Sequence, residues 1–177
     1  MIMVEDWNVV VIGDGDKEQD LLESLEEDGK FERSGFRDAV IGDVEDIVEF
    51  LEDAERKKYP YVKRVIPIDD AFVVSPESVI DKLKQRVKEY LDEVEPGETF
   101  GFRIEHRGLK GGVTSQKVER EVSGYFFDLI EKVYGRKPKV NVKKPDKLIV
   151  IAILGNRCGI GFITREMLEK YSVIKVR

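Results

Sequence analysis

The sequence predicts an α+β (α/β) protein built from two modules that meet at Ser75–Pro76. Short β-branched runs alternate with segments whose apolar residues recur every three to four positions, a pattern typical of strands mixed with amphipathic helices. The charge also changes at the junction. Residues 1–75 carry 9 Lys and Arg against 21 Asp and Glu, whereas residues 76–177 carry 21 against 15. We therefore expect an acidic domain over residues 1–75 and a basic domain over residues 76–177.

The first half has the element order of a ferredoxin-like domain. Asp16 is expected to cap a first helix that Gly29 ends, and Asp43 is expected to cap a second helix. The expected strands cover residues 7–13, 31–36, 39–41 and 65–74. The resulting order β-α-β-β-α-β is the split βαβ arrangement of ferredoxin-like folds.

The second half is expected to form another α/β domain. Ser75-Pro76-Glu77 predicts a helix start, because it combines a capping hydroxyl, a proline at the first helical position and an acid near the helix dipole. A long helix is predicted from Thr114 or Ser115 to Gly135. Strands are predicted at residues 99–105, 139–143, 148–154 and 160–163, and Thr164 is expected to cap a short last helix.

Composition excludes several classes of protein. No apolar run reaches the roughly 18–20 residues that a membrane span needs, and the start of the chain lacks the basic and apolar regions of a secretory signal. The single cysteine, Cys158, cannot form an internal disulfide, so a cytoplasmic location is expected. The charged content of 37%, rich in Lys and Glu, is typical of proteins from hot environments.

The sequence offers little for catalysis, so we expect no catalytic residue, no metal and no cofactor. His106 is the only histidine, which rules out a histidine-based triad and a site with several histidine ligands. No phosphate-binding P-loop or zinc spacing is present. Gly13-Asp-Gly-Asp resembles half of a dinucleotide fingerprint, but its acids would repel phosphate, and we reject that interpretation.

A basic segment surrounds the expected start of the long helix. Glycines 108, 111 and 112 allow close approach of a ligand to the backbone, and a helix start supplies free N–H donors that suit phosphate. The alternative is a solvated loop with ordinary surface cations. Basic groups gathered on one module attract a polyphosphate backbone, which favours RNA as the ligand. The candidate RNA contacts here are Arg103, His106, Arg107, Lys110, Thr114, Ser115, Lys117 and Arg120.

Two weaker candidates lie further along the chain. Lys144 and Lys147 flank a Pro-Asp pair, and the alternative is a charged β-turn, since Pro-Asp is ordinary turn chemistry. Arg157 lies in a glycine-rich connection beside Cys158, where it could contact RNA or activate the thiol. A small buried cysteine is the favoured interpretation of Cys158.

Together these motifs resemble the THUMP domain over residues 76–177. The resemblance rests on Phe100–Arg107, on Thr114-Ser115 opening a helix with Arg120 and Gly124, and on Lys-Pro-Asp before an aliphatic strand. The tail from Cys158 to Tyr171 is similar to the end of the THUMP adaptor that accompanies the tRNA cytidine acetyltransferase.

The resemblance implies that the ferredoxin-like and THUMP pair binds the acceptor stem and 3′ CCA end of tRNA. It implies RNA contacts at Arg103, Arg107, Thr114, Ser115, Lys117 and Arg120, with Lys144 and Lys147 flanking and Gly124 allowing close helix packing. We therefore expect a non-catalytic adaptor whose cations form one continuous surface around the start of the long helix. Its partners would be tRNA and a separate modifying enzyme, with an acetyltransferase favoured and no membrane involved.

Other functions stay open. The chain could be the RNA-binding subunit of a tRNA thiolation or methylation enzyme. It could also be a small enzyme that acts on RNA or a nucleotide through His106 or Cys158. In addition, the acidic half could dock a basic partner protein, which is compatible with the adaptor function.

Overall fold

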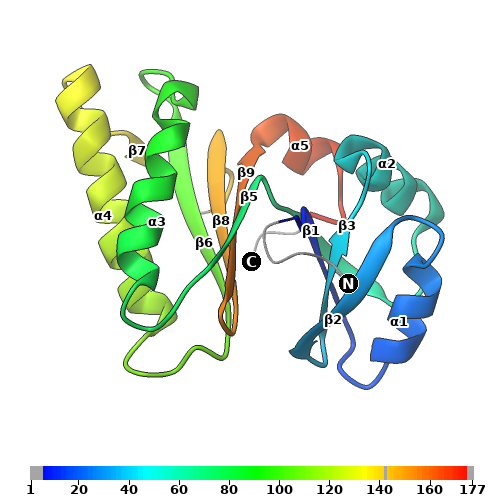
Figure 1. Cartoon of the computed structure of the whole chain (residues 1–177). Coiled ribbons are helices and arrows are strands. Elements are labelled where there is room, and N and C mark those ends of the chain that lie inside the picture. Colours follow the sequence, from blue (N-terminus) through cyan, green and yellow to red (C-terminus); the bar gives the residue numbers. More distant parts are fainter. Residues whose placement is uncertain (1–5, 142, 175–177) are drawn as a thin grey trace.

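Two β-sheets face each other in the computed structural model, and helices cover the outer side of each sheet (Figure 1). The structure describes residues 6–141 and 143–174. The N-terminal lobe is the four-stranded sheet with α1 (Glu18–Leu25) and α2 (Ile47–Lys57). The C-terminal lobe is the five-stranded sheet with α3 (Val79–Val87) and α4 (Ser115–Tyr134). The predicted α+β class is confirmed.

The N-terminal lobe has the predicted ferredoxin-like topology. Its elements are β1 (Val9–Gly13), α1 (Glu18–Leu25), β2 (Lys30–Phe36), β3 (Ala39–Asp43), α2 (Ile47–Lys57) and β4 (Val62–Pro67). The strand order is β2-β3-β1-β4, and each neighbouring pair is antiparallel. Because β3 lies between β1 and β2, the β1-α1-β2 unit is split, as the element order predicts.

Both predicted helix caps in this lobe are wrong. α1 begins at Glu18 without a side-chain cap, after a turn in which the Lys17 N–H donates to the Asp14 carbonyl. α2 is capped by Asp46, whose carboxylate accepts the N–H groups of Val48 and Glu49. Asp43 cannot cap α2, because it still pairs with the neighbouring strand as the last residue of β3.

The C-terminal lobe holds the mixed sheet. Its strands are β5 (Asp70–Val73), β6 (Thr99–Arg107), β7 (Lys139–Val140), β8 (Lys147–Leu154) and β9 (Arg157–Thr164). Its helices are α3 (Val79–Val87), the 3₁₀ helix η1 (Lys88–Glu93), α4 (Ser115–Tyr134) and α5 (Arg165–Lys170). The strand order is β5-β9-β8-β6-β7, with β6 parallel to β7 and β8. The predicted strand 139–143 is shorter than expected, and Val142 lies outside the described residues.

Residues 65–74 were predicted as one strand in which Pro67 makes part an edge or a bulge. The continuous strand is wrong, because the chain changes sheets after Pro67. Pro67 ends β4, and the Asp69 N–H already donates to the Ile160 carbonyl of β9. β5 therefore lies at the edge of the C-terminal sheet, paired with β9. The segment after α5 contacts the N-terminal lobe again, since the Val65 N–H of β4 donates to the Val173 carbonyl at 2.9 Å. The domain division at Ser75–Pro76 stays a prediction.

The start of α3 follows the predicted capping chemistry at a different boundary. The Ser75 hydroxyl accepts the Ser78 N–H, and the Ser78 hydroxyl accepts the Ser75 N–H. These reciprocal bonds hold a turn in front of the helix, so α3 begins at Val79 rather than at Pro76.

β8 forms the centre of the core because both of its faces are buried. Ile149, Ile151 and Ile153 face α3 and α4, whereas alternate residues such as Val150 face the N-terminal lobe. This explains its continuous apolar sequence. The two sheets approach closely at β9, where a Cβ on Gly161 would lie 2.1 Å from the Pro67 carbonyl oxygen. Among the described residues, no helix is long and apolar enough to cross a membrane.

Candidate nucleic-acid interface

The loop between β6 and α4 lies at the end of the C-terminal lobe where α3 and α4 begin (lower end in Figure 1). A Cβ on Gly111 would lie 3.1 Å from Pro76, so the loop contacts the segment before α3. Gly111 and Gly112 have φ angles of +93° and +87°, which favour glycine. We call this region, residues 108–120 with the first turn of α3, the helix-start end.

Three of the predicted contacts at the helix-start end are exposed cations. Lys110, Lys117 and Arg120 have no ion-pair partner among the residues that the structure describes. Thr114 caps α4 as predicted, since its hydroxyl accepts the Lys117 N–H at 3.1 Å. The half-buried Ser115 begins the helix. Free cations beside a helix N-terminus form a surface that suits phosphate groups.

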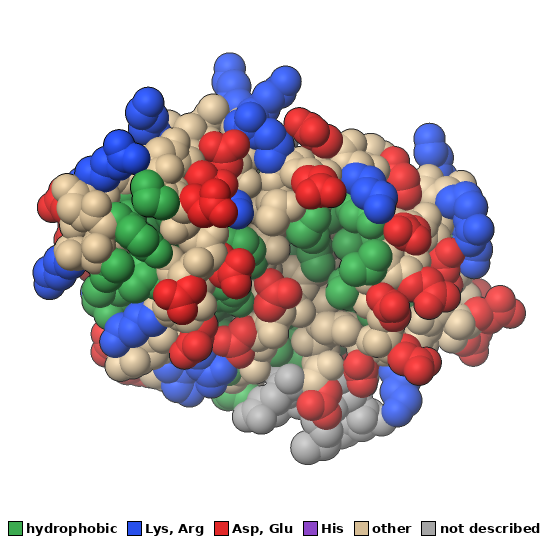
Figure 2. All heavy atoms as spheres, turned by 90° about the horizontal axis from the view of Figure 1, so that it is seen from above, with side chains coloured by type: hydrophobic (Ala, Val, Ile, Leu, Met, Phe, Trp, Pro, Cys, Tyr) green, Lys and Arg blue, Asp and Glu red, His purple; other side chains and the backbone are tan. Residues whose placement is uncertain are grey.

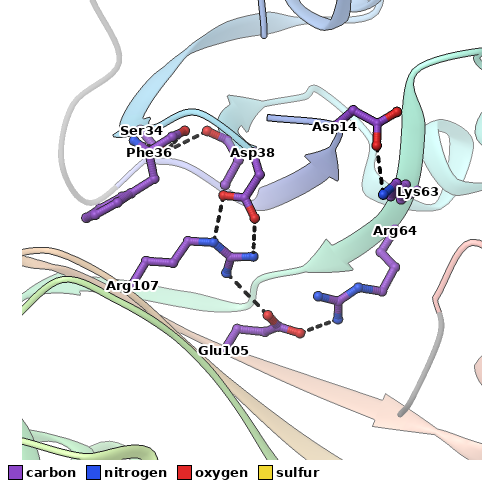
Figure 3. Close-up of polar contacts among 9 residues, drawn as sticks. Asp14, Ser34, Phe36, Asp38, Lys63, Arg64, Glu105 and Arg107 are labelled. Atoms are coloured by element: carbon purple, nitrogen blue, oxygen red, sulfur yellow. Dashed lines mark hydrogen bonds and ion pairs between the residues drawn. The ribbon is translucent and has the colours of Figure 1, made fainter. Parts of the chain in front are cut away.

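Arg107 is placed differently from these cations. Its guanidinium donates to Asp38 through Nε at 2.8 Å and through Nη2 at 2.7 Å, and Nη1 lies 3.3 Å from Glu105 (Figure 3). Glu105 also accepts a hydrogen bond from Arg64 of β4. Arg107 therefore connects the two lobes in this structure, and its contact with RNA stays a prediction.

The pKa values of the two carboxyl groups follow from this network. Hydrogen bonding from Arg107 lowers the pKa of Asp38 below its ordinary value. Burial acts to raise the pKa of Glu105, but the Arg64 and Arg107 guanidinium groups outweigh it and lower the pKa. Asp38 is thus held as a carboxylate by Arg107, and Glu105 is held as one between Arg64 and Arg107.

Arg103 and His106 lie on opposite faces of β6. Arg103 shares the face of Glu105 and Arg107, toward the N-terminal lobe, whereas His106 shares the face of Phe102, toward the helices. Arg103 Nη2 and His106 Nε2 are both buried and have no hydrogen-bond partner in the described part of the chain. Sequence reasoning placed the two side chains on one surface, and the structure does not bring them together.

Arg157, Lys144 and Lys147 do not add free cations to the helix-start end. Arg157 lies at that end but pairs across the lobes with Glu32, at 3.8 Å. Lys147 pairs with Glu98 at 3.5 Å at the start of β8, and Lys144 is exposed just before it.

The predicted convergence of all cations on one surface is wrong. Lys147 lies opposite Phe100 at the start of β6, whereas Leu154 lies opposite Arg107 at its end. Phe100 and Arg107 are seven positions apart along β6, so the two ends of the strand are separated by about 23 Å. Because β6 and β8 are parallel, the segment after β6 and the segment before β8 must lie at opposite ends of the sheet.

The opposite end has a pocket that sequence reasoning missed. It has a volume of about 420 Å³ and is lined by Lys143, Lys144, Pro145, Arg165, Leu168, Glu169 and Ile174. Arg165 donates to the Lys144 carbonyl and lies 3.4 Å from Asp146. No local signal connects Arg165 to Lys144, because 21 positions separate them. Figure 2 looks onto this end and shows acidic side chains spread among the basic ones.

The chemistry of Cys158 differs from that of a reactive thiol. Its side chain is fully buried in the core between the sheet and α3 and α4. Burial raises the pKa of the thiol well above its ordinary value. Within the described residues, no three His, Cys, Asp or Glu side chains are grouped as metal ligands.

Residues 77–162 match the family model of the THUMP domain. This segment of the chain therefore corresponds to a THUMP domain. Its fold is similar to TrmN from Thermus thermophilus, with a TM-score of 0.57 and 18% identity over 88% of this chain and 45% of that chain. It is also similar to PH1313 from Pyrococcus horikoshii Ot3, with a TM-score of 0.55 and 17% identity over 89% of this chain and 54% of that chain.

A third similar structure is a 4-thiouridine synthetase–RNA complex with bound ATP, with a TM-score of 0.50 and 20% identity over 89% of this chain and 41% of that chain. At these identities the likeness shows the fold. The chain spans about half the length of these solved structures. No curated protein sequence matches the chain.

Proposed function

We propose that this THUMP protein binds tRNA at its helix-start end and presents it to a separate modifying enzyme. The proposal is carried by the exposed cations Lys110, Lys117 and Arg120 beside the α4 N-terminus, which have no ion-pair partner in residues 6–141 and 143–174 and lie within the matched THUMP segment. Duplex RNA is recognised mainly through its phosphates and 2′-hydroxyl groups, so these side chains and the free N–H groups of α4 suit a stem. The similar thiouridine synthetase was solved with RNA, which supports the same class of ligand.

An adaptor function is favoured over a stand-alone enzyme by the two side chains that such an enzyme would use. Cys158 is fully buried with a raised pKa, and His106 has its Nε2 atom buried. Neither is placed to attack or deprotonate a substrate at the surface. The partner we propose is a tRNA cytidine acetyltransferase, because the tail from Cys158 to Tyr171 resembles the end of its THUMP adaptor.

The N-terminal lobe is the proposed contact for that partner. A surface pocket of about 270 Å³ between α1 and α2 is bordered by six carboxylate side chains: Glu27, Asp28, Glu45, Asp46, Glu49 and Asp53. These carboxylates repel RNA phosphates and would attract a basic protein surface. RNA and enzyme would then occupy different lobes.

The RNA proposal is tested by filter binding with tRNA and with the same tRNA lacking its CCA end. We expect the double variant Lys110→Ala/Lys117→Ala to bind at least about tenfold more weakly than the wild type. Lys143→Ala/Lys144→Ala removes the same charge at the opposite end, so it is the matched control. Equal weak binding to both RNAs, or equal losses in both variants, would count against the proposal.

The adaptor proposal needs a second assay. Acetylation of cytidine in tRNA is measured with a purified tRNA cytidine acetyltransferase, with and without the full chain. We expect the chain to raise the rate and the helix-start double variant to do so less. No change in rate on adding a chain that binds tRNA would refute the acetyltransferase as partner and leave RNA binding intact.

A further inference from the structure

Gly124 lies on the outer face of α4, where no other residue covers it. It is exposed, and a Cβ built on it would meet no atom within 4 Å. The expectation that this glycine allows close helix packing is therefore wrong. Glycine is less favourable than alanine in a helix interior, so neither packing nor helix propensity accounts for it.

Cations of α4 surround this position. Arg120 lies one turn and Lys117 two turns before Gly124 on the same face, and both are unpaired among the described residues. Two of the carboxylates on α4, those of Glu121 and Asp128, are engaged by other lysines. Glu121 lies 3.7 Å from Lys84 of α3, and Asp128 lies 3.7 Å from Lys137.

Lys84 of α3 and Lys88 of η1 add two cations to the same surface, on either side of the Tyr125 ring of α4. The Nζ atoms of Lys84 and Lys88 lie 5.6 Å and 5.9 Å from the ring centroid of Tyr125. Lys88 is exposed and has no carboxylate partner in the described part of the chain. α3 and α4 lie side by side with both N-termini at the helix-start end (Figure 1). Tyr125 is about 12 Å along α4 from Lys117, so the surface continues the helix-start end.

We propose that the outer face of α3 and α4 is a second binding surface for the RNA backbone, which rests on the proposed function. A strand that leaves the helix-start end runs along α4 and passes over Gly124. There the missing side chain lets a phosphate or ribose approach the helix backbone. Lys88, Lys117 and Arg120 neutralise phosphates on either side. The ligand is the sugar–phosphate backbone of an RNA stem.

The absence of apolar anchors favours RNA over a protein partner on this face. The exposed large hydrophobic residues of the described chain are Val48, Val73, Val133 and Val140, and none lies between Lys117 and Asp128. The cores of protein interfaces are depleted of charge and rich in aromatic and apolar side chains. A face of glycine and lysines around one half-buried tyrosine lacks such a core.

The deciding variants separate folding from binding. Gly124→Ala and Gly124→Gln are expected to raise the urea midpoint of unfolding, because both side chains favour the helix and meet open space. Gly124→Gln is nevertheless expected to weaken tRNA binding at least about fivefold, because its side chain occupies the path of the RNA. Ser123→Ala, on another face of α4, is the neutral control and should leave binding unchanged. Lys88→Gln should reduce the salt slope of binding by about 1.

The outcomes distinguish this inference from the proposed function. If Gly124→Gln binds tRNA like the wild type while Lys110→Ala/Lys117→Ala loses binding, the second surface is refuted and the helix-start site stands. If Gly124→Gln lowers the urea midpoint, the position is packed and the inference also fails. If the wild-type chain does not bind tRNA, both proposals fail together.

Discussion

Arg107 and Asp38 lie 69 positions apart in the sequence and form a two-point ion pair, at 2.8 and 2.7 Å, across the two lobes. The guanidinium comes from the end of β6, and the carboxylate comes from the turn between β2 and β3 (Figure 3). Because the planar guanidinium of Arg107 contacts both oxygens of the Asp38 carboxylate, it fixes the relative orientation of the two side chains as well as the distance between them. This pair sets how the acidic lobe sits beside the helix-start end.

Removing this ion pair should destabilise the protein. Asp38→Asn keeps the shape of the side chain and removes its charge, and we expect a loss of about 1–2 kcal/mol in the free energy of unfolding. We discount larger values because 38% of the Asp38 side chain is exposed. Asp14→Asn is the control, since Asp14 pairs with Lys63 on the open surface and should cost at most about 0.5 kcal/mol. Urea unfolding measures both, and equal losses would contradict the assignment.

Stability should fall in acid through the same network. The pKa values of Asp38 and Glu105 are lowered in the folded protein, so the unfolded chain binds more protons as the pH falls below about 4. Their contribution is complete above the unfolded pKa values and is lost as the pH falls through the folded ones. We expect Asp38→Asn to flatten the stability profile between about pH 5 and pH 3. A variant profile parallel to that of the wild type would show that the pair does not control acid unfolding.

The salt dependence of tRNA binding should identify the cations that contact phosphates. Each cation that neutralises one phosphate contributes about 1 to the slope of log affinity against log salt. Lys110→Ala/Lys117→Ala should therefore reduce the slope by about 2, whereas Lys143→Ala/Lys144→Ala should leave it unchanged. Titrations at four or more salt concentrations measure the slopes. The reverse ranking would move the RNA to the opposite end of the sheet.

Gly161→Ala should be strongly destabilising. Its new Cβ would lie 2.1 Å from the Pro67 carbonyl oxygen, and a backbone atom cannot move aside cheaply. We expect a loss of at least about 2 kcal/mol, measured by urea unfolding. Gly15→Ala is the control, because its nearest neighbour would be 3.8 Å away. If the urea midpoint of Gly161→Ala equals that of the wild type, β9 and Pro67 do not approach as closely as described.

Alkylation of Cys158 should report unfolding. Because the thiol is fully buried and its pKa is raised, iodoacetamide should react with it only when the protein opens. We expect the labelling rate to rise in proportion to the unfolded fraction as urea is added. Fast labelling of the native protein at neutral pH would restore the enzyme hypothesis.

Local signals predicted those parts of the structure that depend on neighbouring residues. α4 begins after Thr114 and ends before Gly135, as expected, because a capping hydroxyl and a left-handed glycine act within one turn of the helix. The ferredoxin-like topology followed from element order alone. Asp43 was expected to cap α2, but its pairing with Lys30 of β2 keeps it in β3, and Asp46 forms the cap.

The site was harder to predict, because its main determinants are distant in sequence. Nothing near Arg107 indicates that Asp38 binds it, and nothing near Lys147 indicates that the parallel pairing of β6 and β8 separates it from the helix-start end. Gly124 was placed correctly on the long helix, but its surroundings depended on which face of that helix is covered.

The chain connects the two sheets twice, once after Pro67 and once at Val173, and these connections determine the smallest fragment that can fold stably. A fragment that begins at Pro76 would lose β5, leave the edge of β9 open and remove Phe72 from the core, while the partner fragment would lose the hydrogen bond from Val65 to Val173. Neither half could be excised intact, and melting should take place in a single step. A transplant of residues 77–162 into another protein would therefore have to carry both lobes together.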